Sequence, residues 1–208
     1  MKVFFKLSLL LYLLVAQVAC TINAVYASEI QLTDKQARAL QALNDESQSQ
    51  TTKSLRLKIT ELQDNQGQKY LGALVSRAEL LPYLTQLQGL LKEEFNYYRS
   101  LQVARDHQLF HLTLLSPREY QLADKAIIKK LLSSASNHSF SSQLNVTLFG
   151  LGKAAQGDNT AFYVIAQSAD AQLIRQRFIL PAKDFHITLG FNPSDIYGVD
   201  KGLLTLID

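Results

Sequence analysis

Hydrophobic and polar residues alternate along several stretches of the chain, which is the pattern of half-buried β-strands. The first stretch places Leu55, Leu57 and Ile59 on one face and polar residues on the other. A polar turn at residues 64–67 separates it from a second apolar stretch at residues 70–76. This pattern predicts a β-hairpin.

Leucine-rich segments at helical spacing follow the hairpin, at residues 80–91 and 95–103. The apolar segment 109–115 then has the character of a third strand. A connecting helix is predicted to begin after Ser116, because a serine followed by proline and then by glutamate is typical of a helix start. The apolar residues expected on its buried face are Ile127, Ile128, Leu131 and Leu132. The helix is expected to end in the polar run 133–142.

The second part of the chain repeats this order of elements. Strands are predicted at residues 144–151 and 161–167, with a turn at residues 156–159 between them. A helix at residues 170–178 and a strand at residues 185–191 complete the repeat. We therefore predict an α+β fold made by duplication of a strand-strand-helix-strand unit, with a central cleft between two antiparallel sheets.

The predicted domain spans residues 54–208, with halves at about 54–116 and 143–208. Each half ends in a strand on which phenylalanine, histidine, an aliphatic residue, threonine and leucine follow one another, beginning at Phe110 and at Phe185. A single His-x-Thr on a strand is usually a half-buried structural histidine. Two copies of the motif at the same place in each repeat favour a functional role for both histidines.

Side chains alternate along a strand, so His111 and Thr113 share one face, about 7 Å apart, and His186 and Thr188 do the same. Continued alternation would place Gly190 on the same polar face of the second strand. The residues expected on its apolar face are Phe185, Ile187, Leu189 and Phe191.

Two opposed histidines suit the chemistry of a phosphodiester. Displacement at phosphorus needs a base for the attacking water or hydroxyl and an acid for the departing oxygen. Imidazoles with an ordinary pKa near 6.5 can fill both roles, while threonine hydroxyls donate hydrogen bonds to the non-bridging oxygens. This chemistry requires no metal ion and no cofactor, and the sequence leaves open which histidine is the base.

The N-terminus has the pattern of a signal peptide, because two lysines precede an apolar run at residues 7–19. Val25 and Ala27 are the small residues that a signal peptidase accepts, which predicts removal of residues 1–27 and a mature chain that starts at Ser28. The apolar run is too short to favour a stable membrane span. We therefore expect a periplasmic or secreted protein.

Cys20 supports an alternative, because it follows Val18 and Ala19 and resembles the acylated cysteine of a bacterial lipoprotein. Being the single cysteine, it leaves the folded domain without disulfides, thiolate metal sites or a cysteine nucleophile. Residues 28–53 are expected to form a short N-terminal helix and a polar connector, since Thr33 opens a capping box before an apolar stripe.

The balance of charge argues against binding of long nucleic acids. The full chain has 21 lysines and arginines against 18 aspartates and glutamates, a net charge of +3. Removal of the signal peptide takes away Lys2 and Lys6, which leaves a net charge of +1. Proteins that hold long polyanions usually have a strongly basic face. A small ligand with one or two phosphates fits this composition better.

The other two histidines are assigned no role. His107 and His111 are four residues apart, which would suit a metal pair on a helix, but we expect both on a strand, where that spacing separates them by about 13 Å. His138 lies among serines and an asparagine, which favours a solvated surface histidine. We therefore predict no metal site.

The two motifs, His111-Leu-Thr113-Leu and His186-Ile-Thr188-Leu, resemble those of the 2H phosphoesterases. The segment 185–202 looks most similar to the bacterial Swiss Army Knife branch of that superfamily. The resemblance implies a metal-independent phosphodiesterase that acts on cyclic or 2′-5′ phosphodiesters of nucleotides or short RNA ends. It also implies that the histidines are acid and base and that the threonines contact phosphate.

The loop after the second motif contains Asp195, Tyr197 and Lys201, which could close over the ligand. Tyr197 and Lys201 are the expected substrate contacts, although solvated surface charge is the better explanation of Lys201. Three further aromatic residues could stack on a base, namely Tyr97, Tyr98 and Phe191.

The main alternative function is a non-catalytic exported module that binds a nucleotide or a protein on the same fold. A structural lipoprotein anchored at Cys20 is a third possibility.

Overall fold

The computed structural model describes residues 52–133 and 142–207. The predicted signal peptide, Cys20, the predicted N-terminal helix and His138 lie outside these residues. None of the helices in the described part combines the length and apolarity that a bilayer crossing requires.

The described elements follow the duplicated order that the sequence predicts. The first half contains β1 (Lys53–Gln63), β2 (Lys69–Val75), α3 (Leu81–Leu91), the short 3-10 helix η1 (Lys92–Glu94), α4 (Phe95–Asp106) and β3 (Phe110–Leu115). The connection contains α5 (Pro117–Leu122) and α6 (Lys125–Ser133). The second half contains β4 (Gln143–Gln156), β5 (Asn159–Gln167), α7 (Ala169–Arg177), β6 (Phe185–Asn192) and the 3-10 helix η2 (Leu203–Thr205). The predicted α+β class is confirmed.

The connection contains two helices where the sequence pattern predicts one. α5 begins at the expected capping box, in which the Ser116 amide donates to Glu119 Oε2 at 2.8 Å. Ala123 then takes an extended conformation, which ends α5. The Asp124 carboxylate accepts a hydrogen bond from the Ala126 amide at 2.7 Å and starts α6. The expectation of one helix is therefore wrong, because an aspartate that caps a new helix start interrupts the apolar stripe.

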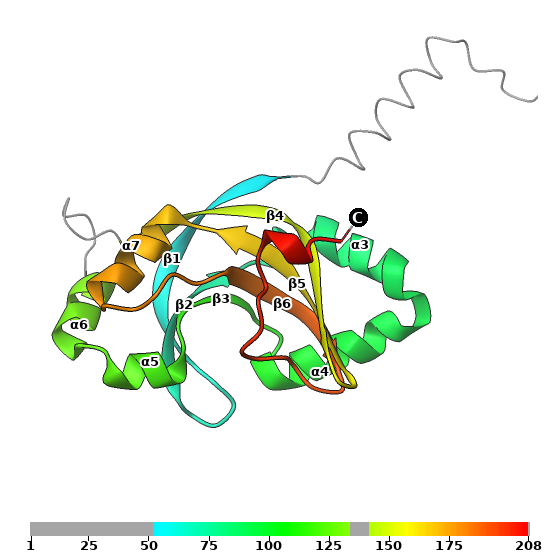
Figure 1. The fold of residues 1–208 in the computed structure, drawn as a ribbon, viewed down its shortest axis with the longest axis horizontal. Coiled ribbons are helices and arrows are strands. Elements are labelled where there is room, and N and C mark those ends of the chain that lie inside the picture. The colour runs from blue at the N-terminus through cyan, green and yellow to red at the C-terminus, as the bar shows by residue number, and fades with distance from the viewer. Residues whose placement is uncertain (1–51, 134–141, 208) are drawn as a thin grey trace, which may run out of the picture. The chain divides into compact units, whose positions relative to one another are not determined.

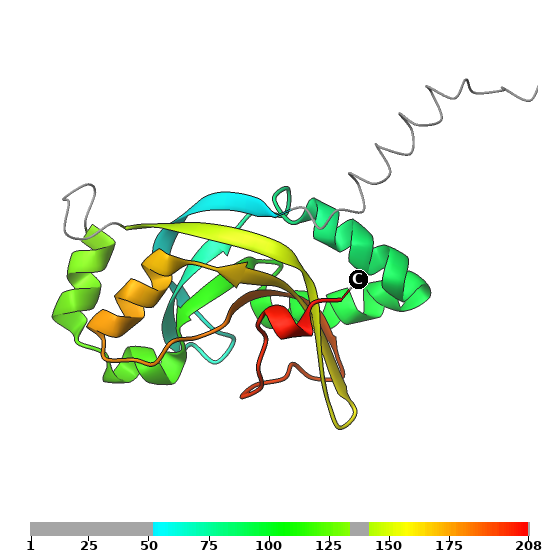
Figure 2. The same ribbon diagram turned by 45° about the horizontal axis from the view of Figure 1, so that its top comes forward.

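All strands are antiparallel to their neighbours, in the order β3-β2-β1-β4-β5-β6. β1 joins the halves, because its residues 53–58 pair with β4 and its residues 59–63 pair with β2. The expected two sheets thus share one strand. β3 and β6 stand at opposite ends of this order and yet contact each other, so the sheet curls until the two motif strands meet (Figures 1 and 2).

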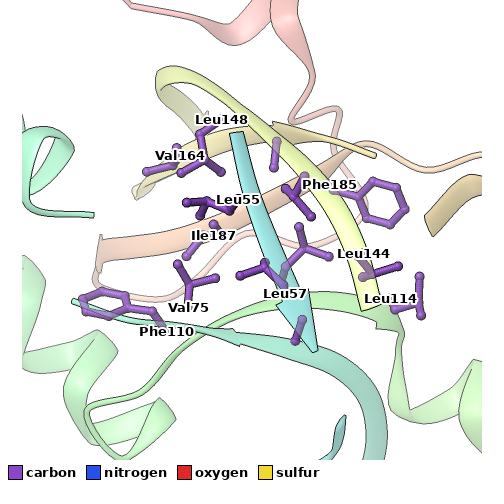
Figure 3. Close-up of a cluster of buried hydrophobic side chains, with 14 of the residues drawn as sticks. Leu55, Leu57, Val75, Phe110, Leu114, Leu144, Leu148, Val164, Phe185 and Ile187 are labelled. Atoms are coloured by element: carbon purple, nitrogen blue, oxygen red, sulfur yellow. The ribbon is translucent and has the colours of Figure 1, made fainter. Parts of the chain in front are cut away.

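The core lies inside this curled sheet. Figure 3 shows Leu55 of β1, Leu144 of β4, Leu114 of β3 and Ile187 of β6 among the side chains that meet there. Full burial of one such side chain is worth roughly 1.5–3 kcal/mol. In Figures 1 and 2, α3 and α4 lie at one side of the strands, and α5, α6 and α7 lie at the other. The motif strands are therefore packed from both sides.

Each motif strand contains a β-bulge immediately after its threonine. In β3, Thr113 pairs with Gly72 of β2 while Leu115 pairs with the next residue, Leu71, so Leu114 is the extra residue. A Cβ on Gly72 would lie 2.6 Å from the carbonyl oxygen of Leu112, so the close approach of the strands here needs glycine. The duplication therefore extends to this local irregularity.

In β6 the extra residue is Leu189, because Thr188 pairs with Tyr163 and Gly190 pairs with Phe162. A bulge shifts the alternation of faces by one residue. Gly190 therefore faces Tyr98 of α4, and Phe191 packs in a separate small cluster. The expectation that Gly190 joins the polar face and that Phe191 joins the main apolar face is wrong for this reason.

Candidate active site

One pocket is lined by all six residues that the sequence predicts as catalytic residues or substrate contacts. Its volume is 730 Å³. The predicted residues that line it are His111, Thr113, His186, Thr188, Tyr197 and Lys201. The first two come from β3 and the next two from β6, so the contact between the edge strands brings the two motifs together. The fold thus brings the two His-x-Thr pairs into one pocket.

The local sequence explains why the motif side chains point into the pocket. Phe110, Leu112 and Leu114 are buried, and His111 and Thr113 between them are only partly buried. In β6, Phe185 and Ile187 are buried and His186 is partly buried, whereas Thr188 is buried as well but still lines the pocket. The apolar residues anchor each strand to the core, and this packing fixes the opposite face toward the pocket.

His186 is the more enclosed of the two histidines. Its Nε2 atom lies 3.4 Å from Lys201 Nζ, and the ring of Tyr163 packs at a centroid distance of 5.4 Å. Burial lowers the pKa of His186 to about 3, and the Lys201 ammonium contributes to the same shift. His186 is therefore a neutral imidazole at pH 7 that can accept a proton.

His111 has a different electrostatic environment. The ring of Tyr70 packs against it at a centroid distance of 5.4 Å. Burial lowers the pKa of His111, and Arg105 adds to this effect, whereas the carboxylates of Asp106 and Asp195 oppose it. The pKa of His111 is therefore lowered on balance although two carboxylates oppose the shift, whereas at His186 a lysine in contact adds to the lowering.

The hydroxyl groups of Thr113 and Thr188 are free to act on a ligand. Neither has a hydrogen bond to another residue within the ranges 52–133 and 142–207. Each hydroxyl can donate one hydrogen bond. The two threonines can therefore bind the non-bridging oxygens of a phosphate held between the histidines.

A buried network of charges forms the floor beside His186. The Asp195 carboxylate forms an ion pair with Arg105 of α4 and lies 3.3 Å from Lys201 Nζ. Arg105 also pairs with Asp106 at 2.7 Å. Burial alone would raise the pKa of Asp195, but the charges of Arg105 and Lys201 hold it below its ordinary value. Asp195 is thus an ionised carboxylate that bridges two cations.

Lys201 is buried, with 4% of its surface exposed. The interpretation of Lys201 as solvated surface charge is therefore wrong, because its ammonium turns inward to Asp195 and His186. Burial lowers the pKa of Lys201, and the Asp195 carboxylate opposes that shift. Lys201 lines the pocket, so its predicted contact with the substrate stays a prediction.

Of the four aromatic residues that the sequence suggests as contacts, Tyr197 lines the pocket and the other three do not. Tyr197 is 73% exposed at the pocket, and its hydroxyl lies 3.4 Å from Arg105 Nη1. Tyr98 is buried against Phe162, as ordinary helix packing would have it. The Arg105 guanidinium lies over the ring of Phe191, with its Cζ atom 4.8 Å from the ring centroid. Neither Tyr98, Phe191 nor the exposed Tyr97 lines the pocket.

Sequence reasoning missed five charged residues of the pocket, namely Asp64, Arg105, Asp106, Lys183 and Asp184. The Lys183 ammonium has no ion pair or hydrogen bond with another described residue. Its position three residues before His186 was the one feature of the sequence that could have indicated a role for Lys183.

His107 also lines the pocket, but it ends α4 in a left-handed conformation and is not on the strand as expected. No group of three or more His, Cys, Asp or Glu in the described part is arranged to hold a metal ion.

Comparison with known proteins identifies the family. The family model for the Swiss Army Knife 2H phosphoesterase domain matches residues 70–197, which is more than half of the chain and includes both motifs. No curated protein and no solved structure matches. Two His-x-Thr strands that meet in one pocket of a duplicated α+β fold agree with this match. The chain belongs to the Swiss Army Knife family of 2H phosphoesterases.

Proposed function

We propose that this protein hydrolyses a cyclic or 2′-5′ phosphodiester of a nucleotide or a short RNA end by two-histidine acid–base catalysis. The convergence of both His-x-Thr pairs in one pocket carries the proposal. The imidazoles supply acid and base, and the threonine hydroxyls supply donors for the phosphate, so the proposed reaction needs no metal ion.

The size and charge of the pocket support a small substrate. A volume of 730 Å³ lies within the range of about 300–1,000 Å³ that small-molecule sites occupy. Arg105, Lys183 and Lys201 line it, and two of these three cations are already balanced by carboxylates. Lys183 is therefore the cation best placed to meet a phosphate. Tyr197 is exposed enough to stack on a base.

We assign the base to His186 and the acid to His111. Water attacks phosphorus while His186 takes a proton from it, and the bond from phosphorus to the leaving oxygen breaks as His111 donates a proton to that oxygen. Charge that develops on the non-bridging oxygens is met by the hydroxyls of Thr113 and Thr188. A phosphate monoester and a free hydroxyl are the products.

The contact between Lys201 and His186 supports this assignment. An ammonium 3.4 Å from Nε2 disfavours a second positive charge there, so His186 stays neutral and available to accept a proton. His111 has two carboxylates as well as Arg105 near it, and no lysine of the described residues is in contact with its ring. The negative charge of a bound phosphodiester opposes the lowering of the His111 pKa by burial and prepares His111 as the acid.

Replacement of Lys201 by methionine should shift the acidic limb of the pH profile of kcat/KM to higher pH. Without the ammonium the pKa of His186 rises, so the base is lost to protonation at a higher pH than in the wild type. Lys201→Arg keeps the charge and should leave the limb in place. An unchanged or lower limb in Lys201→Met would contradict the assignment, whatever happens to the absolute rate.

The substrate class is tested by a turnover screen of purified protein. It should include 2′,3′-cyclic nucleotides, 2′-5′ dinucleotides and cyclic dinucleotides, with products separated by chromatography. We expect turnover of at least one member and none of a linear 3′-5′ RNA longer than the pocket. Binding of these compounds without any turnover would favour the alternative of a non-catalytic binding module.

We also propose that the protein acts outside the cytoplasm, on the basis of the predicted signal peptide. Mass spectrometry of the mature protein should find Ser28 at its N-terminus. An acylated Cys20 would instead indicate a membrane-anchored lipoprotein, and an intact N-terminus would contradict export.

A further inference from the structure

Two buried arginines cross between the halves and bind the same point of each motif strand. Arg99 of α4, in the first half, donates through Nη1 to the carbonyl oxygen of Leu189 in the second half. Arg175 of α7, in the second half, donates through Nη1 to the carbonyl oxygen of Leu114 in the first half at 2.8 Å. Leu114 and Leu189 are the two bulge residues.

The burial of both arginines indicates a specific role. Arg99 is 7% exposed and Arg175 is 2% exposed. Burial lowers the pKa of Arg99 to about 10, so it still carries its charge at neutral pH. Arginine is almost never this buried unless its donors are paired. A long cationic side chain at the same place in each half points to a function shared by the halves.

The carbonyl groups that the arginines bind are those that the bulges release. The extra residue of a bulge is left out of the regular ladder, and a buried carbonyl without a partner is costly. Bonds from guanidinium groups satisfy these carbonyls and hold the bulges in one geometry. Each bulge directly follows a motif threonine, Thr113 in β3 and Thr188 in β6.

Further contacts hold each arginine in place. The Arg99 guanidinium lies over the ring of Phe110 at 4.6 Å and bonds Gln102 Oε1 at 2.6 Å. Arg175 bonds Glu119 Oε1 at 2.8 Å and the Pro181 carbonyl at 2.9 Å. The arginines therefore connect the helix of one half rigidly to the motif strand of the other.

We propose that Arg99 and Arg175 are positioning residues that act through Thr188 and Thr113, respectively. Each holds the bulge that aims one threonine hydroxyl at the phosphate, and together they keep the two halves in register across the pocket. This inference rests on the proposed phosphodiesterase function, because the threonines matter only if they meet a phosphate.

Double-mutant cycles test the proposal against a merely structural role. Arg99→Met should lower kcat by about 10- to 100-fold, since a displacement near 1 Å can cost that much. In a Thr188→Val background it should cause little further loss, whereas in a Thr113→Val background the two losses should multiply. Arg175→Met should show the reverse pairing, with Thr113 as its coupled partner. The uncoupled pair in each cycle is the matched control.

Arg99→Lys and Arg175→Lys serve where a methionine variant does not fold, because lysine keeps one donor and should restore part of the activity. The same cycles measured on the dissociation constant for adenosine 2′-monophosphate need no turnover. Losses that multiply in all four pairings would overturn the positioning role. A wild type without turnover but with the predicted coupling in binding would instead refute the proposed catalysis and retain the positioning role.

Discussion

His186→Ala should reduce turnover of the phosphodiester substrate by about 10²- to 10⁴-fold, the usual contribution of a positioned acid or base. The variant removes the neutral imidazole that accepts the proton from water. It leaves the apolar side of β6 untouched, so the protein should fold as the wild type does. The measurement is kcat at saturating substrate, beside the melting temperature of both proteins.

His107 provides the matched control for this loss. It lines the same pocket but lies at the end of α4, outside both motifs, with a left-handed backbone that asparagine tolerates. His107→Asn should therefore change kcat by no more than a few-fold. Equal losses in His107→Asn and His186→Ala would show that any change in the pocket abolishes activity and would remove the support for His186 as base.

Asp195→Asn should destabilise the folded protein by about 3 kcal/mol at pH 7, because it leaves Arg105 and Lys201 buried without their shared carboxylate. The effect should depend on pH. The pKa of Asp195 in the folded protein lies below its ordinary value of 3.8, so its contribution is full above that value and is lost as the pH falls through the folded pKa. Urea unfolding at pH 7 and near pH 3 should show the difference between wild type and variant narrowing in acid.

The exposed ion pair between Lys53 and Glu79 is the control for the loss of stability expected in Asp195→Asn. Both side chains are 39% exposed, and such pairs contribute about 0–1 kcal/mol. Glu79→Gln should therefore have little effect at either pH. An Asp195→Asn variant as stable as Glu79→Gln would show that the buried network does not support the fold.

The sequence alone was sufficient for both motifs and, apart from the division of the connecting helix into α5 and α6, for the order of elements, because these depend on local patterns. Alternation places His111 and Thr113 on one face whatever the rest of the chain does. The repeated motif then predicted that the second pair would face the first, and both pairs line one pocket. Local patterns and their duplication thus led to the central feature of the candidate site.

The bulges could not be predicted, because an extra residue leaves the sequence alternation intact. The run from Phe185 to Phe191 looks like an unbroken strand, yet Leu189 shifts the last residues to the other face. The cause is tertiary, since the Leu189 carbonyl is bound by Arg99, 90 positions earlier in the chain. Long-range pairing of this kind has no local signature.

The charged network was hidden for the same reason. Arg105 and Asp195 are also 90 positions apart and meet only when α4 packs beside β6. Lys201 follows the second motif in a polar loop, where a solvated charge is the ordinary expectation, and its burial depends on Asp195 as a partner. Composition cannot distinguish a buried ion pair from two surface charges.

The central claim is that two opposed imidazoles catalyse hydrolysis in this pocket. It is tested most directly by hydrolysis of a 2′,3′-cyclic nucleotide in the presence of EDTA, by the wild type and by the single and double alanine variants of His111 and His186. We predict turnover by the wild type that EDTA does not change, and a loss in the double variant close to that in either single variant, because acid and base act as a unit. Turnover that EDTA abolishes, or wild-type rates in both single variants, would contradict the account.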